Sequence, residues 1–527
     1  MIEPSCAVEV VQLYYLPDRF LQGEPEQIGI QFAFEEGPVS EVQICPDQMT
    51  PRRLYKADPR FRGITKIGKV LDEIERQYQD KLAHPEQCAG LCFRQSGSYH
   101  LPDGSWVSVI GGQLIGECSY PYVIDIPDTG QMQMQPAEKP LALLAGELLL
   151  VNPQVLLAIA YLIVTLVRSW VQGITSSWQA VLMVVGKQGM GKTTLAERIT
   201  GWYKDEYGGN ALFFGAGSTP ASMRDILVDM RDLPVVIDDL CLSASPSVQR
   251  KAKDLGAQFV REGANAAAIT KKKPGGETIR LRCAAGLVMT AEFALENGSD
   301  ITRCIYLTID HPLGLPESLT SSMIGAAVQG FLEWFLPHQE RARAALEKML
   351  KQPDNPEVHQ RVWKNLIILK WGMTAFLRAA EDEGCSDACR AKLMEMFNEA
   401  LVSSIQYQND LLKKLDRRKK KGNIAAVILA GLESDAFQMT KNIDKLWKKD
   451  GIWWRGDAGL RKDALERFIR LQDGYADYTI TQIVRELKDI GALVIQEEGT
   501  AQVKVKKDTP RVYRLRLDVL RSEAEEY

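Results

Sequence analysis

A glycine-rich segment directly after a short apolar run leaves few folds open to this chain. The apolar run is Val181 to Val185, and the segment that follows, Gly186 to Thr193, has the sequence GKQGMGKT. Its spacing, Gly, four residues, then Gly-Lys-Thr, is that of a phosphate-binding loop. Thr194 to Thr200 can continue as a helix, whose N-terminal amides and dipole favour a bound phosphate. The pattern predicts a strand, a tight loop and a helix within a parallel α/β sheet.

The loop contains the residue types that hold a nucleotide and its metal. Glycines let the backbone wrap closely around phosphates, Lys192 would reach the β- and γ-phosphates, and the Thr193 hydroxyl would coordinate magnesium. We therefore predict ATP and Mg²⁺ as cofactors. The residues expected to contact the nucleotide are Gly186, Gln188, Gly189, Met190, Gly191, Lys192, Thr193 and Thr194.

Two consecutive carboxylates follow another apolar run further along the chain. Val235 to Ile237 predicts a buried strand that ends at Asp238 and Asp239. We expect Asp238 to hold the hydrated magnesium, and Asp239 to act as the base that orients the attacking water. The alternative for Asp239 is the N-cap of a following helix.

At 527 residues the chain is too long for one hydrophobic core, and its patterns divide it into five parts. Residues 1–138 predict a small α+β domain with strands at Ile28 to Phe34, Ser105 to Ile110 and Tyr122 to Ile126, a helix at Val70 to Lys81 and a polar connector at Gln131 to Pro136. Residues 139–312 predict the P-loop core behind a buried helix within Leu148 to Val167. Residues 313–412 predict a helical lid, 413–425 a basic linker, and 426–527 a winged-helix-like domain.

Each of the last three large parts has its own expected elements. The P-loop core should hold a mainly parallel sheet with strands at Ala180 to Val185, Ala211 to Gly215, Pro234 to Ile237, Cys283 to Thr290 and Cys304 to Ile309. The lid should hold helices at Met323 to Phe335, Glu340 to Leu350, Val362 to Glu381 and Ala391 to Lys414. The C-terminal domain should hold helices at Asp457 to Leu471 and Thr479 to Ile490, then strands at Ala492 to Gln496 and Val512 to Leu517.

The phosphate loop, the Asp238 strand and a separate strand expected between them resemble the AAA+ branch of the P-loop fold. More specifically, roughly residues 90–310 look like the helicase-like replication ATPases of phages and integrating mobile elements. The resemblance implies that Thr290, at the end of the fourth strand, senses the γ-phosphate, and that Arg303, before the fifth, reaches the ATP of a neighbouring subunit in a ring. The alternatives are a plain strand residue for Thr290 and a surface ion pair for Arg303. AAA+ enzymes usually have Glu where this chain has Asp239, so hydrolysis is expected to be slow or to require rearrangement.

Local basic segments are candidates for DNA contact. Lys271, Lys272 and Lys273 precede Pro-Gly-Gly between two short runs, which predicts a hairpin with lysines at its tip that could track DNA phosphates in the channel of a ring. A second basic run, Lys413 to Lys421, precedes the expected recognition helix Thr479 to Ile490. Either segment could instead be a solvated surface, and a winged helix can also bind protein.

The bulk composition agrees with an ordinary globular protein. The formal net charge is −4, so nucleic acid would have to meet local patches rather than a cationic surface. The first residues do not have the cationic and apolar pattern expected of a signal peptide, and the apolar stretch at Leu148 to Val167 is interrupted and short for a membrane span. We expect a cytoplasmic protein with reduced cysteines and no membrane partner. Cys88/Cys92 and Cys385/Cys389 have weak metal-ligand spacing and are interpreted as helix-face neighbours.

Three functions remain open at this point. The first is Mg-dependent ATP hydrolysis that drives DNA translocation or unwinding by a homo-oligomeric ring, in replication of a mobile element or phage. The second is a P-loop switch or signalling ATPase, for example in phage defence, whose C-terminal domain binds protein. The third, less favoured because a winged-helix-like tail has no evident purpose there, is a small-molecule kinase. Single-stranded DNA should stimulate ATP turnover only in the first case.

Overall fold

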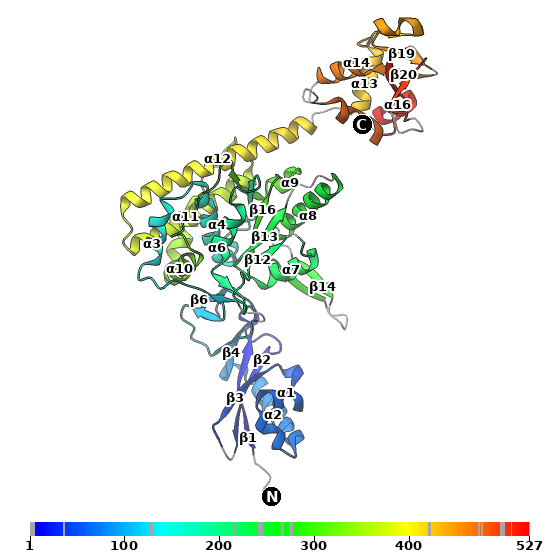
Figure 1. Ribbon diagram of the computed structural model, residues 1–527. Helices are drawn as coiled ribbons and strands as arrows, with labels where there is room; N and C mark the ends of the chain where they lie inside the picture. The colour runs from blue at the N-terminus through cyan, green and yellow to red at the C-terminus, as the bar shows by residue number, and fades with distance from the viewer. Residues whose placement is uncertain are drawn as a thin grey trace. The chain divides into compact units, whose positions relative to one another are not determined.

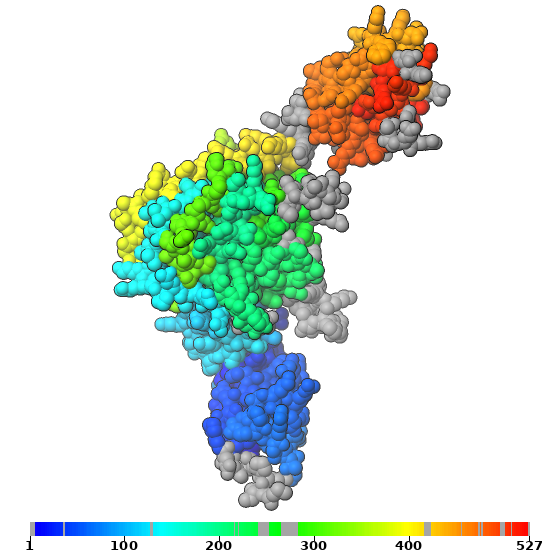
Figure 2. Space-filling view, viewed as in Figure 1, coloured from blue at the N-terminus to red at the C-terminus, as the bar shows by residue number. Residues whose placement is uncertain are grey.

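The computed structural model describes most of the chain, coloured in Figure 1 and Figure 2. The described residues are 6–34, 37–126, 130–215, 217–240, 246–264, 268–272, 278–419, 423–454, 456–472, 475, 478–495, 501–506 and 509–525. They form two compact units, Met1–Asn409 and Asp410–Tyr527. The first unit is mixed α/β with a parallel sheet and many helices, and the finer division into five domains stays a prediction.

A five-stranded parallel sheet forms the centre of the first unit. Its order is β12-β13-β16-β10-β17, and each neighbouring pair of strands is parallel. The strands are apolar along almost their whole length because helices cover both faces. All five predicted strands are confirmed, with the bounds β10 Val181–Gly186, β12 Phe213–Gly215, β13 Pro234–Leu240, β16 Gly286–Ala291 and β17 Cys304–Ile309.

One apolar helix, α4 (Gln154–Leu166), anchors the sheet, and every residue in it except Gln154 is buried. Tyr161 Oη donates to the carbonyl oxygens of Ala180 and Leu287 at 3.2 and 2.9 Å. Thr165 packs closely on Gly286, so that a Cβ atom at position 286 would lie only 2.3 Å from Thr165 Oγ1. The predicted buried helix is thus confirmed. The other helices around the sheet are α3 Pro140–Leu148, α5 Arg168–Ile174, α6 Lys192–Thr200, α7 Pro220–Asp229, α8 Pro246–Ala264 and α9 Gly298–Ile301.

None of the described helices is, on its own, long and apolar enough to cross a membrane. Taken together, α4 and α5 would pass by length and composition alone, but they are bent by 74° where they meet.

Three long helices follow the sheet in sequence: α10 (Ser321–Leu350), α11 (Gln360–Asp382) and α12 (Asp387–Lys419). The sequence predicted two helices where α10 runs unbroken past Pro337, so that division was wrong. A proline removes one backbone hydrogen bond, but the buried face continues on both sides of it through Phe335, Leu336, Ala342 and Leu346. Tertiary burial outweighs the local helix-breaking signal.

The N-terminal part has its own mixed sheet, with the order β3-β2-β1-β4-β8. Ile74 and Tyr78 of α2 (Ile67–Leu82) belong to the core that the sheet buries, so the predicted helix is confirmed. The predicted connector is not unpaired, because β9 (Gln131–Met132) pairs with β11 (Tyr203–Lys204). The remaining bounds are β1 Cys6–Tyr15, β2 Gln27–Phe34, β3 Ser40–Ile44, β4 Ala89–Phe93, β8 Tyr122–Ile124, α1 Pro51–Ala57, and the 3-10 helices η1 Pro17–Arg19, η2 Pro46–Gln48, η3 Pro59–Gly63 and η4 Pro85–Gln87.

A small antiparallel sheet connects this part to the central sheet. It consists of β5 (Gly97–His100), β6 (Trp106–Ile110) and β7 (Gln113–Ile115), and a tight turn at Leu101–Ser105 joins the first two strands. Asp232, fully buried just before β13, accepts from the backbone N–H groups of Ser98 and Ser169, both at 2.8 Å. Burial raises the pKa of this carboxyl, while Arg231 and these hydrogen bonds oppose the rise.

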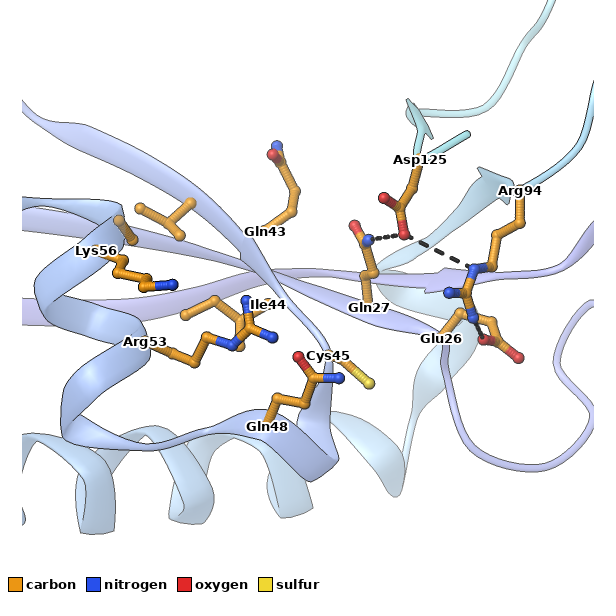
Figure 3. A pocket seen from close by; sticks show the side chains of 12 residues that line it. Glu26, Gln27, Gln43, Ile44, Cys45, Gln48, Arg53, Lys56, Arg94 and Asp125 are labelled. Atoms are coloured by element: carbon orange, nitrogen blue, oxygen red, sulfur yellow. Dashed lines mark hydrogen bonds and ion pairs between the residues drawn. The ribbon is translucent and has the colours of Figure 1, made fainter. Parts of the chain in front are cut away.

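A polar groove of about 480 Å³ opens in the N-terminal part, beside β3 (Figure 3). Arg53 and Lys56 of α1 line one end, while at the other end Arg94 pairs with Glu26 at 2.8 Å and with Asp125 at 3.7 Å. None of the predicted nucleotide-binding residues lines this groove.

The second unit is built on the sheet β18-β19-β20-β22-β21. Two predictions here were wrong: Asp457–Arg461 is strand β20 rather than helix, and the expected strand at Ala492 reduces, among its described residues, to an isolated bridge between Leu493 and Leu515. The predicted helix from Thr479 is confirmed as α15. The bounds are α13 Ile424–Glu433, β18 Met439–Thr440, η5 Ile443–Lys448, β19 Gly451–Trp454, α14 Lys462–Arg470, α15 Ile480–Asp489, β21 Gln502–Lys504, β22 Arg511–Leu515 and α16 Leu517–Glu525.

The described cysteines are free thiols. Cys92 lies in strand β4, so the interpretation of Cys88 and Cys92 as neighbours on a helix was wrong. Cys389 lies in α12, while Cys385 precedes that helix. Across the described ranges, no three or more His, Cys, Asp or Glu side chains cluster as metal ligands.

Candidate functional site

The predicted phosphate loop joins β10 to α6 as a tight turn. Gly189 and Gly191 have φ values of 80° and 92°, a region that residues with a Cβ rarely adopt. Helix α6 begins at Lys192, so its unpaired N-terminal N–H groups open onto the loop. The motif glycines therefore permit a backbone path that leaves a cradle of donors at the carboxyl end of the sheet.

The Lys192 side chain lies within the loop. Its Nζ donates to the carbonyl oxygens of Gly186 and Lys187 at 2.8 and 2.9 Å. An ammonium group has three donors, so one remains after these two contacts. The contacts hold the positive charge at the centre of the loop.

The central contact of the site joins Thr193 at the start of α6 to Asp238 near the end of β13. Thr193 Oγ1 lies 3.1 and 3.2 Å from the two carboxylate oxygens of Asp238. Mg²⁺ prefers oxygen ligands, such as this hydroxyl and this carboxylate. Their place beside the N-terminus of α6 fits a metal held next to a bound phosphate. The two predicted metal ligands are thus adjacent in space, although far apart in sequence.

Thr290 links the two consecutive carboxylate residues. Strand β16 lies between β10 and β13, so its fully buried Thr290 meets Asp238 from the side. Thr290 Oγ1 donates to Asp238 Oδ1 at 2.5 Å and accepts from the backbone N–H of Asp239 at 3.0 Å. A single hydroxyl therefore positions both residues.

Asp239 has an unusual backbone. Its φ is 68°, and the β13–β16 register shifts between Ile237 and Leu240. Because of this bulge, the exposed Asp239 does not follow the alternation of side chains between the two faces of the strand. Leu240, the residue after Asp239, still belongs to strand β13, so Asp239 is not the N-cap of a helix and the capping alternative is wrong.

Arg303 lies at the opposite end of the sheet from the loop. Cys304 pairs with Val181 and Ile309 with Gly186, and at about 3.3 Å per residue this length of strand separates Arg303 from the loop by roughly 20 Å. Arg303 Nη1 donates to the carbonyl oxygen of Ser299 at 2.6 Å. The residue is therefore out of reach of the phosphate loop of its own chain.

Two more arginines gather near Arg303. Arg361 of α11 donates to Thr302 Oγ1 at 3.3 Å, and Arg261 of α8 pairs with the buried Asp300 at 2.7 Å. Burial lowers the pKa of the Arg303 guanidinium, and the charges of Arg361 and Arg261 act in the same direction. Sequence reasoning missed Arg361, because its helical pattern gave no signal that it would approach the start of β17.

The hairpin predicted around the lysine triplet is confirmed in its described part. Strand β14 (Ala268–Lys272) pairs with β15 (Thr278–Arg282), and Lys272 lies opposite Thr278. Lys271 and Lys272 are therefore strand residues rather than tip residues, whereas Lys273 lies outside the described residues.

Comparisons with known proteins give a likeness in fold. No family model matches the chain, and no curated protein does. A solved structure described as the SCCmec type IV Cch active helicase matches with TM-score 0.52 and 12% identity, over 100% of this chain and 95% of that one. The apo C-terminal region of NrS-1 (13% identity, TM-score 0.29, 96% of each chain) and a ligand-bound JCV helicase (11% identity, TM-score 0.19, 54% of this chain and 72% of that one) also match. The first likeness is one of overall fold, and the other two TM-scores are too low to carry an argument.

Proposed function

We propose that this chain hydrolyses ATP with magnesium at the loop between β10 and α6. The observation that carries the proposal is the meeting of Thr193 Oγ1 with the Asp238 carboxylate at 3.1 Å, beside the N-terminus of α6. Phosphate-binding loops and metal-binding carboxylates work as such a pair. When bound, magnesium would neutralise the charge that develops on the phosphates.

The side chains around the loop then take separate roles. Lys192 holds its charge against the β- and γ-phosphates, and the α6 amides donate to them. Asp239, exposed beside Asp238, accepts a proton from the attacking water and orients it. Thr290 keeps both carboxylate residues in place and senses the γ-phosphate through Asp238. Together these side chains bind the nucleotide, orient the attacking water and accept one proton from it.

We further propose that the chain is an AAA+ ATPase that works as a homo-oligomeric ring. The order β12-β13-β16-β10-β17, with a strand between the loop strand and the Asp238 strand, supports this assignment. So does the position of Arg303, because roughly 20 Å of β17 separates it from its own loop, as expected for an arginine that reaches a neighbour's nucleotide.

We propose that the hydrolysis drives DNA translocation or unwinding, in replication of a mobile element or phage. Support comes from the fold shared over the whole chain with a structure described as an active helicase. The β14–β15 hairpin with Lys271 and Lys272 would supply the phosphate contacts, together with Lys273, and the winged-helix-like C-terminal unit is a second candidate surface.

ATP turnover with and without single-stranded DNA tests this proposal. A DNA translocase should be stimulated several-fold, whereas a switch ATPase with a protein-binding C-terminal unit should be indifferent to DNA, and a kinase should need a small acceptor. The triple variant Lys271→Ala, Lys272→Ala, Lys273→Ala should lower the ratio of stimulated to unstimulated turnover. An equal fall in both rates would instead indicate a defect in folding or assembly and would refute the channel role.

A further inference from the structure

The second unit displays a tryptophan on its surface. Trp447 keeps 63% of its area exposed, although tryptophan is among the side chains that gain most from burial. Elsewhere in the described part of this unit, Leu471 is exposed to a greater extent, at 78%, but it has no ring and lies at the end of α14. A large exposed aromatic side chain needs a physical reason.

The backbone beneath Trp447 is held firmly. The residue lies in the 3-10 helix η5, whose Leu446 is fully buried in a cluster with Ile452, Val503 and Val512. The helix is capped by Asn442 Oδ1, which accepts from the N–H of Asp444 at 2.9 Å. Arg461 Nη1 donates to the carbonyl oxygen of Trp447 at 3.0 Å. The indole is therefore presented from a fixed backbone rather than from a loose loop.

The residues around Trp447 are strongly basic. Residues 441–449 hold four lysines and a single acid, Asp444, in a chain whose net charge is −4. Lys441, Lys445 and Lys448 are exposed, and none of them forms an ion pair with any described residue. In a 3-10 helix, residues three apart are eclipsed, so Lys445 and Lys448 lie on one side of the helix next to Trp447.

We infer that residues 441–449 bind single-stranded DNA, with Trp447 stacking on a base and Lys445 and Lys448 contacting the flanking phosphates. An aromatic platform beside cations is the combination that holds single strands without reading their sequence. A duplex keeps its bases stacked on each other and offers no free face. A protein partner is less suited, because lysine is depleted in the core of protein interfaces.

This inference rests on the proposed function in one respect only, namely that the bound single strand is DNA. It concerns an element other than the phosphate loop, the β14–β15 hairpin or α15. Binding can be measured without nucleotide, so its outcome does not depend on whether the loop hydrolyses ATP.

Fluorescence anisotropy of labelled oligo-dT of about 15 nucleotides, titrated with the full chain, tests the inference. Trp447→Ala should weaken binding about tenfold or more, and Trp447→Phe, which keeps a ring, should lose less. Each phosphate contact on a single strand contributes about 0.7 to the slope of log K against log salt, so Lys445→Ala with Lys448→Ala should reduce that slope by about 1.4.

Matched controls keep the test specific. Tyr207→Ala removes an aromatic ring that is 86% exposed in the first unit, and Lys348→Ala with Lys351→Ala removes two exposed lysines three residues apart; both should bind as the parent does. Unchanged oligo-dT binding by Trp447→Ala would overturn the inference. So would a loss restricted to duplex DNA or to oligo-rU, or a parent protein that binds vesicles containing phosphatidylserine but not oligo-dT.

Discussion

Replacing Thr290 by valine would remove one hydroxyl from the candidate site and keep the side-chain shape. The residue is fully buried, donates to Asp238 at 2.5 Å and accepts from the N–H of Asp239 at 3.0 Å. Without the hydroxyl, Asp239 keeps its φ of 68° with no partner for that N–H, and Asp238 loses one of the two hydroxyls that fix its oxygens. Both carboxylates should then sample positions away from the nucleotide.

The size of the effect follows from the hydrogen bonds lost. A hydrogen bond to a charged group is worth about 1.5–3 kcal/mol. Asp238 is only half-buried and keeps its contact with Thr193, so we take a value near the lower end, about 2 kcal/mol, for the loss in positioning. At about 1.4 kcal/mol per factor of ten, this lowers turnover about 30-fold.

The rate of steady-state ATP hydrolysis at saturating ATP and magnesium measures this loss of turnover. Thr290→Ser is the matched control, because it keeps the hydroxyl and loses one methyl group, and its turnover should stay within about threefold of the parent. If Thr290→Val hydrolyses ATP at the parent rate, or if both variants lose turnover equally, the positioning role of the hydroxyl is refuted.

Three further predictions follow from other contacts. Asp239→Ala should bind ATP but not hydrolyse it, because the metal ligands remain; filter binding with labelled ATP checks this, and hydrolysis at the parent rate would contradict the role of Asp239. Arg303→Ala and Lys192→Ala should each be inactive alone, but a mixture should regain activity, because some interfaces then pair an intact loop with an intact arginine; no recovery would argue that Arg303 does not act across an interface. The hydrogen bonds from Arg60 hold the pKa of Asp58 at about 2, below its ordinary 3.8, so the stability they contribute should be fully present above about pH 4 and lost as the pH falls toward 2. Asp58→Asn should abolish that part of the acid sensitivity in urea titrations, and a parallel loss in variant and parent would speak against it.

The core of the site could be predicted because its signals are local. The glycine spacing fixed the loop, and continuous apolar runs located β10 and β13, so the meeting of Thr193 with Asp238 followed from the way parallel strands end together. The roles assigned to these residues stay predictions. The same holds for cytoplasmic location, the ring and the DNA contacts.

What sequence could not give depends on distant packing. The local sequence around Pro337 predicts a break in the helix. The burial of residues on both sides of Pro337 keeps α10 continuous instead. Asp457–Arg461 directly precedes a helical pattern but forms a strand because β19 and β22 pair with it from both sides. The approach of Arg361 to Thr302 and the bulge at Asp239 likewise arise from contacts between separate elements.

The buried Asp232 fixes the start of β13. The strand starts two residues after this carboxylate, which is bonded to Ser98 of the small N-terminal sheet, and it ends in the two carboxylates of the candidate site. The hydrogen bonds of Asp232 therefore hold the small N-terminal sheet against the strand that carries Asp238. The position of the candidate site along the sheet thus depends on a buried carboxylate that lies outside the site itself.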